Sequence, residues 1–148
     1  MQIEKEKRVL VFDPGESTGW MLGNFAGDII DGGTDIKGHS GIADLILQHS
    51  PEIVVCERFH LFPGAAKSFS WSTFYPCEII GVIRYMCEEH GITLVEQNPS
   101  IKRYAGGFQK DWTEFKARNI TTEHTKDAYL HLKYFYKFNF TKSRKVQE

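Results

Sequence analysis

The chain has 148 residues, 41% of them hydrophobic and 25% charged, which is typical of a soluble globular domain that buries about two-thirds of its unfolded surface. No apolar run approaches the roughly 20 residues of a membrane helix, and the N-terminus lacks the apolar core of a secretory signal, so we expect a cytoplasmic protein that enters no membrane. The three cysteines are odd in number and lack CxxC spacing, which excludes a recognisable disulfide framework or zinc site.

The net charge of −1 hides an uneven distribution along the chain. Residues 1–98 hold 7 Lys or Arg against 14 Asp or Glu, whereas residues 99–148 hold 11 against 5. This asymmetry is compatible with a basic surface beside an acidic pocket, and equally with a solvated basic tail.

The first half of the chain predicts a strand, a hairpin, a helix and a second buried strand. Continuous apolar runs indicate the two buried strands, and apolar residues at helical spacing indicate the helix. In chain order these elements cover residues 9–13, 17–25 with 29–36, 38–50 and 53–57.

The second half predicts a loop with a Pro-Gly pair, a long helix, a strand, a short helix and a last helix capped by Thr121 or Thr122. The order implies a mixed α/β fold, with a five-stranded sheet of three antiparallel strands and then two parallel ones, flanked by helices. We expect one domain over residues 1–148, with about 140–148 as a flexible tail. The helices and the strand cover residues 70–90, 92–98, 99–107 and 122 to about 138.

Both buried strands of the parallel type end in a carboxylate, Asp13 after "VLVF" and Glu57 after "IVVC". Asp13 could cap the Pro-Gly turn that follows it, or it could be the first ligand of a metal site. If the two strands are neighbours, their carboxylates repel each other unless a proton or a cation compensates. Mg²⁺ prefers such oxygen ligands, so a metal site would need a third contributor from another element.

The start of the last helix, "TEHTKDAYLH", offers that contributor. His124 and Asp127 are three residues apart and project from one helix face, while Glu123 and Asp127 form a competing pair. A solvated helix N-terminus, where acidic residues favour the helix dipole, would also explain Asp127. Ala128 and Leu132 lie near the same side, however, which indicates that this face packs on the core.

Together, "FDPGESTGW", "VVCERF" and "HTKDA" resemble, in order and spacing, the motifs of the RuvC branch of the RNase H-like nucleases, the Holliday junction resolvases. The family places an Asp-Pro-Gly on the first strand, a Glu at the end of the fourth, and a His or Asp three residues before an Asp on the last helix. The expected order of helices and strands agrees along almost the whole chain.

The resemblance implies hydrolysis of DNA phosphodiesters with two Mg²⁺ ions, for which Mn²⁺ would substitute. It assigns catalysis and metal binding to Asp13, Glu57, His124 and Asp127, with His124 either binding a metal or orienting water. The substrate would be a four-way (Holliday) or other branched DNA junction. The protein would act in the cytoplasm of a cell or, if a virus encodes it, of the host.

In such resolvases the loop after the strand-end Glu carries an aromatic residue that stacks at the junction centre. Here we assign that role to Phe62 and expect Phe59 to belong to the core. Apolar residues on the predicted helix 70–90 exceed what one face needs, which favours a homodimer about as much as simple core packing. The candidate phosphate contacts are Lys67, Lys102, Arg103, Lys110, Lys116 and Arg118.

Three other functions compete with junction resolution. An RNase H-like nuclease could act on flaps or RNA–DNA hybrids, and a non-catalytic nucleic-acid-binding module could share the fold. Actin-like ATPases share a D-x-G-x-[ST] turn, which Asp13, Gly15 and Ser17 satisfy, but they need a second domain and far more residues.

Overall fold

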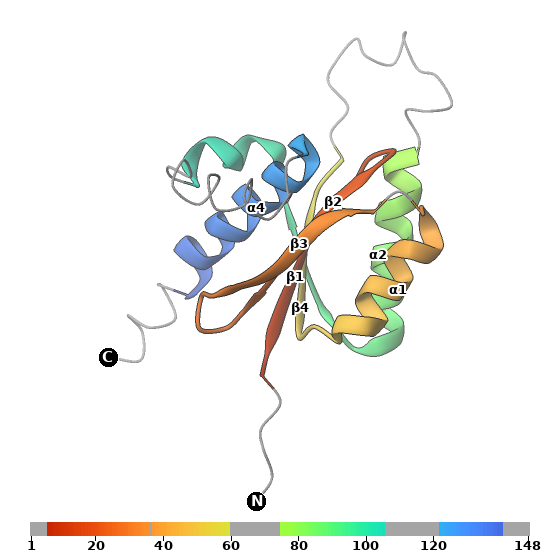
Figure 1. The fold of residues 1–148 in the computed structure, drawn as a ribbon, viewed down its shortest axis with the longest axis horizontal. Coiled ribbons are helices and arrows are strands. Elements are labelled where there is room, and N and C mark those ends of the chain that lie inside the picture. The colour runs from red at the N-terminus through yellow and green to blue at the C-terminus, as the bar shows by residue number, and fades with distance from the viewer. Residues whose placement is uncertain (1–5, 36, 60–74, 106–121, 141–148) are drawn as a thin grey trace, which may run out of the picture.

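The computed structural model describes residues 6–35, 37–59, 75–105 and 122–140 and shows one five-stranded sheet in the order β3-β2-β1-β4-β5 (Figure 1). The three N-terminal strands pair antiparallel, and β4 and β5 join parallel to β1, as the sequence predicts. The elements are β1 (Arg8–Asp13), β2 (Thr18–Asn24), β3 (Ile29–Asp35), α1 (His39–His49), β4 (Ile53–Glu57), α2 (Tyr75–His90), β5 (Thr93–Gln97), η3 (Pro99–Tyr104), α4 (Glu123–Phe135) and η4 (Tyr136–Phe140).

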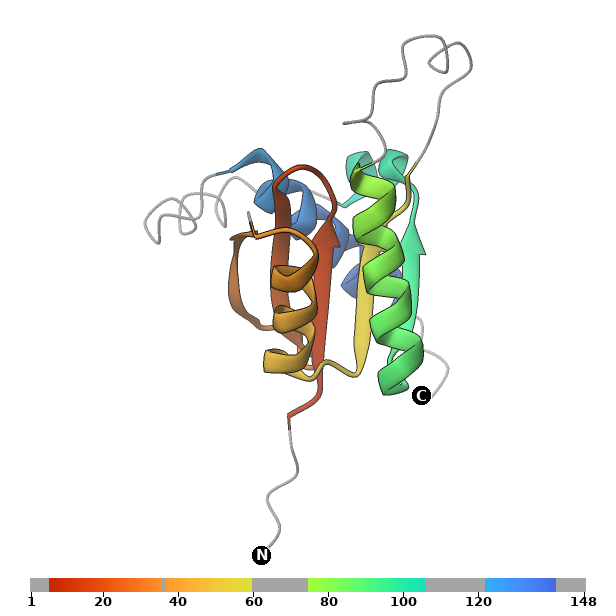
Figure 2. The ribbon, with the colours of Figure 1, turned by 90° about the vertical axis from the view of Figure 1, so that its right-hand side faces the viewer.

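Helices cover both faces of the sheet, with α1 and α2 on one face and α4 on the other (Figures 1 and 2). Side chains alternate along a strand, so Leu10 and Phe12 pack with α1 and α2 while Val9 and Val11 pack with α4. Burial on both faces explains why β1 reads as a continuous apolar run rather than an alternating one.

The same alternation aims the last residues of three neighbouring strands at α4. In the register of the sheet Phe12 lies opposite Cys56, and Glu57 lies opposite Gln97. Asp13 is therefore next to Glu57, and both share the α4 side of their strands with Val11 and Val55. Three polar side chains thus meet at one edge of an otherwise apolar layer.

Two elements differ in detail from the sequence prediction. The short helix after β5 is a 3₁₀ helix over Pro99–Tyr104, and the side chain of Asn98 caps it by accepting from the N–H of Ser100. The last helix is α-helical only to Phe135 and continues as a π-helical turn. The predicted tail from residue 141 lies outside the described residues. No helix within the described ranges has the length and apolar content needed to cross a bilayer.

Gly19 allows α4 to approach the sheet beside Asp13. It pairs with Asp13 across β1 and β2, and a Cβ atom at this position would collide with the backbone of His124 and Thr125. The missing side chain therefore sets how closely the first turn of α4 lies over the strand ends.

We expect Gly19→Ala to destabilise the fold by roughly 1–3 kcal/mol, because the added methyl group overpacks the contact between β2 and α4. Gly81→Ala is the matched control, since a Cβ atom on this exposed residue of α2 meets no neighbour. That change should stabilise the protein by roughly 0.5–1 kcal/mol. Urea unfolding measures both, and equal stability of the two variants would contradict the close approach.

Candidate active site

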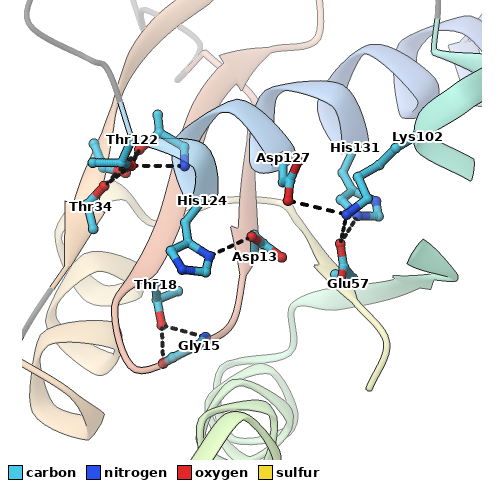
Figure 3. Close-up of polar contacts among 12 residues, drawn as sticks. Asp13, Gly15, Thr18, Thr34, Glu57, Lys102, Thr122, His124, Asp127 and His131 are labelled. Carbon is cyan, nitrogen blue, oxygen red and sulfur yellow. Dashed lines mark hydrogen bonds and ion pairs between the residues drawn. The ribbon is translucent and has the colours of Figure 1, made fainter. Parts of the chain in front are cut away.

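The acidic side chains that the sequence singled out meet at the carboxyl ends of β1 and β4, under the first turns of α4 (Figure 3). Asp13 is only 4% exposed, while the side chains of Glu57 and Asp127 are 18% and 30% exposed. The site therefore combines one deeply buried carboxyl group with two others closer to solvent.

The start of α4 is fixed firmly to the sheet. The hydroxyl of Thr122 caps the helix by accepting from the N–H of Thr125. The hydroxyl of Thr125 in turn donates to the carbonyl of Gly33 on β3 at 2.8 Å. These bonds set the height and rotation of α4, so His124 and Asp127 point to the strand ends.

His124 contacts Asp13 directly, with 3.0 Å between Nδ1 and Oδ2. The turn after Asp13 is closed by Thr18 instead, whose hydroxyl exchanges hydrogen bonds of 3.5 and 3.4 Å with the N–H and carbonyl of Gly15. Of the two explanations for Asp13, the structure thus favours a site residue over a turn cap. Glu123 is exposed, and His124 is the residue of this turn that contacts Asp13.

Lys102 lies inside the acidic cluster. Its Nζ is 3.2 Å from Oε2 of Glu57 and 3.3 Å from Oδ2 of Asp127 (Figure 3). The lysine reaches this position because η3 begins directly after β5, whose last residue, Gln97, pairs with Glu57. The ammonium group therefore neutralises two carboxylates that belong to different elements.

Burial and charge together set the ionisation of the cluster. Burial raises the pKa of Asp13 to about 8, and the negative charges of Glu57 and Asp127 add to this effect. Burial also acts to raise the pKa of Glu57, but hydrogen bonds and positive charge from His131 and Lys102 outweigh it, so this pKa is lowered. Asp13 therefore holds a proton at neutral pH while Glu57 is ionised.

The donor set suits a hard divalent cation, because Asp13, Glu57 and Asp127 bring carboxylate oxygens from three elements to the same end of the sheet. As the side chains lie, no three acidic, histidine or cysteine groups of the described ranges converge on a single point. The position between Glu57 and Asp127 is taken by the ammonium of Lys102. A metal ion here would compete with that ammonium and with the proton on Asp13.

The sequence motifs did not indicate two residues of the cluster, His131 and Gln97. His131 lies on α4, fully buried, and its ring nitrogens contact Glu57 at 2.6 Å and Gln97 at 2.7 Å. Helical spacing could have indicated His131, because it follows Asp127 by four residues and so lies on the same helix face. Gln97 likewise ends a strand at the same edge as Glu57.

Of the proposed DNA contacts, the structure describes only two. Lys102 lies in the acidic cluster, whereas Arg103 is exposed, stacks over the ring of Tyr104 and donates to the carbonyl of Ser100. Phe59 packs partly buried against the core, as expected. Outside the described residues lie Phe62, Lys67, Lys110, Lys116 and Arg118.

No protein-family model matches the chain, and no curated protein sequence does. Solved structures do share its fold. RuvC of Thermus thermophilus, in complex with a Holliday junction substrate, superposes with a TM-score of 0.63 at 14% identity, covering 90% of this chain and 96% of RuvC. The yeast mitochondrial Holliday junction resolvase Ydc2 has a TM-score of 0.52 at 14% identity, covering 90% and 79%.

The fowlpox virus Holliday junction resolvase has a TM-score of 0.51 at 14% identity, covering 92% of this chain and 99% of the viral one. The chain thus shares the mixed α/β fold of these three solved structures, of which it covers 96%, 79% and 99% respectively. This confirms the fold that the three sequence motifs indicated.

We expect Asp13→Asn to stabilise the metal-free protein at pH 8, by at least about 1 kcal/mol or roughly 2–4 °C in Tm. In the native protein Asp13 keeps its proton up to a pKa of about 8, whereas the unfolded chain releases it near 3.8. The native state thus binds the extra proton, and stability contributed by Asp13 falls as the pH rises from about 4 to 8. Asparagine cannot ionise, so the variant does not lose this stability as the pH rises.

Thermal unfolding in EDTA between pH 4 and pH 8.5 measures the difference between Asp13→Asn and the wild type. The gain should shrink towards zero as the pH approaches 4. Asp44→Asn, on the exposed side of α1, serves as the control for removal of any carboxylate. A gain that stays constant with pH would contradict burial of a protonated Asp13.

Proposed function

We propose that this protein is a metal-dependent endonuclease that cuts four-way or other branched DNA junctions. The observation that carries the proposal is the meeting of Asp13, Glu57 and Asp127 at one sheet edge in a fold shared with Holliday junction resolvases. The buried, protonated carboxyl group supports it, since a binding surface for DNA gains nothing from an acidic pocket that repels phosphates.

Asp13, Glu57 and Asp127 would hold the divalent ions, with His124 as a further ligand or as a group that orients water. Mg²⁺ is the proposed ion and Mn²⁺ a substitute, because every carboxylate in the set offers hard oxygen atoms. Two such ions, when bound, supply an activated water and neutralise the leaving 3′-oxygen.

The chain's own residues prepare the site for that chemistry. Asp13 must release its proton before it can coordinate a cation, and its hydrogen bond with His124 keeps the carboxyl group oriented. Lys102 balances the charge of Glu57 and Asp127 in the metal-free protein. The same ammonium group would attract the phosphate of the strand to be cut.

The remaining basic residues of the C-terminal half would bind the phosphate backbone away from the acidic pocket, and Phe62 would stack on splayed bases at the junction centre. The proposed phosphate contacts are Arg103, Lys110, Lys116 and Arg118 of this half, together with Lys67 from residues 1–98. DNA affinity would then depend on a different group of residues from DNA cleavage.

Cleavage of a labelled four-way junction in Mg²⁺ tests the function, with a linear duplex, a flap and an RNA–DNA hybrid as comparison substrates. We expect preferential cutting of the junction that stops in EDTA. Asp13→Asn, Glu57→Gln and Asp127→Asn should each slow cleavage by more than the roughly 10–100-fold typical of a residue that only supports a metal ligand.

Asp31→Asn is a matched control, since Asp31 is exposed on β3, away from the acidic cluster, and its carboxylate accepts from the N–H of the adjacent Gly32. Preferential cutting of flaps or hybrids would assign the fold to a different nuclease activity. Junction binding without cleavage in either Mg²⁺ or Mn²⁺ would indicate a non-catalytic binding module.

We also propose a homodimer, because a four-way junction has two-fold symmetry and one active site cuts one strand. Ile79 and Ile83 of α2 are fully buried in the core, which leaves Tyr85, 62% exposed, as the apolar residue of this helix free to face a partner. Sedimentation should show two copies bound to each junction. Tyr85→Lys should weaken this pairing, whereas a wild type that is monomeric both free and on DNA would contradict the proposal.

A further inference from the structure

His131 is an ionisable residue in the fully buried interior, where ionisable residues are rare. Its side chain is 0% exposed, and both ring nitrogens face oxygen atoms. Nε2 lies 2.6 Å from Oε2 of Glu57, and Nδ1 lies 2.7 Å from Oε1 of Gln97. Two short bonds on opposite sides of a buried ring leave it a single orientation.

The chemistry of the partners assigns direction to these bonds. With its amide oxygen facing the ring, Gln97 can only accept, so Nδ1 of His131 is the donor. One proton then lies between Nε2 and the Glu57 carboxylate, and a charge-assisted bond of this kind is among the stronger hydrogen bonds in proteins. Gln97 thus orients the ring, and the ring orients Glu57.

The orientation of the Glu57 carboxylate depends on such contacts. It is the last residue of β4, its side chain is partly exposed, and a glutamate has more rotatable bonds than an aspartate. The contacts to His131 and to Lys102 both fall on the same oxygen, Oε2. One of these partners, Lys102, would have to move when a cation binds, whereas the buried ring is held in place by Gln97.

The position of His131 on α4 ties it to the other site residues. His124, Asp127 and His131 follow one another at intervals of three and four residues, so they lie on one face of the helix (Figure 3). Through His131 this face is bonded to both β4 and β5. Any change in the height of α4 would therefore move Glu57 together with Asp127.

From this geometry we infer that His131, oriented by Gln97, is a positioning residue that holds the Glu57 carboxylate ready to bind a divalent cation. The inference rests on the proposed function, because it assumes that Glu57 is a metal ligand. Hydrogen-bonded supports of this kind commonly change metal affinity or activity by about 10–100-fold when they are removed.

The test measures Mn²⁺ binding to the full chain without DNA, by electron paramagnetic resonance of the free ion. We expect His131→Leu, which fills much of the space but cannot donate, to weaken binding by about 10–100-fold. His131→Gln keeps an N–H donor near the place of Nε2 and should recover most of that loss. Gln97→Leu frees the ring without removing it and should fall between the two.

Leu132→Val is the matched control, because Leu132 is the neighbouring residue of α4, fully buried, and packs in the apolar layer. It should lower the Tm while leaving Mn²⁺ affinity unchanged, which separates positioning from general destabilisation. In a Glu57→Gln background, His131→Leu should add no further loss, since the two residues act through one contact.

Unchanged Mn²⁺ affinity in His131→Leu would overturn the inference, as would His131→Gln binding as poorly as His131→Leu, which would make the histidine itself a ligand. If His131→Leu fails to fold, His131→Gln and Gln97→Leu decide the question by the same measurement. Junction cleavage is scored separately. A wild type that cuts junctions while His131→Leu keeps full affinity refutes only the positioning role, whereas a wild type that binds Mn²⁺ but cuts no DNA refutes only the nuclease.

Discussion

Confining three carboxylates to one edge of a buried sheet is the constraint on which the rest of this structure depends. Like charges at short range in a partly dry environment repel, so each must find a proton or a positive partner. Asp13 keeps a proton, Lys102 bridges Glu57 and Asp127, and His131 bonds to Glu57. The metal-free site is therefore balanced by groups that a divalent cation could replace.

The fold creates this confinement through its parallel strands. Because β1, β4 and β5 run in the same direction, their last residues reach the same edge, and alternation along each strand turns Asp13, Glu57 and Gln97 to the same face. The helix α4 then closes that face from above, at a height that Gly19 and the Thr122 cap permit. The acidic cluster is a consequence of strand direction and register rather than of any one loop.

The comparison with RuvC and the other two solved structures illustrates how little sequence identity this fold requires. Identity is 14% over 90% of the chain, yet the two structures superpose with a TM-score of 0.63. Most of the sheet needs only apolar side chains of suitable size, which many sequences supply.

Local patterns in the sequence determined the elements and where they end. Apolar runs defined β1 and β4, and their terminal carboxylates indicated the candidate site. The sequence offered Thr121 or Thr122 as the cap of the last helix, and the structure has Thr122 there. Only the tertiary structure decided that Lys102 enters the acidic cluster and that His131 bonds to Glu57, a residue 74 positions away. The physical reason is that strands and helices are indicated by the pattern of neighbouring residues. These contacts depend instead on how η3 and α4 pack against the sheet, and no short stretch of sequence determines that packing.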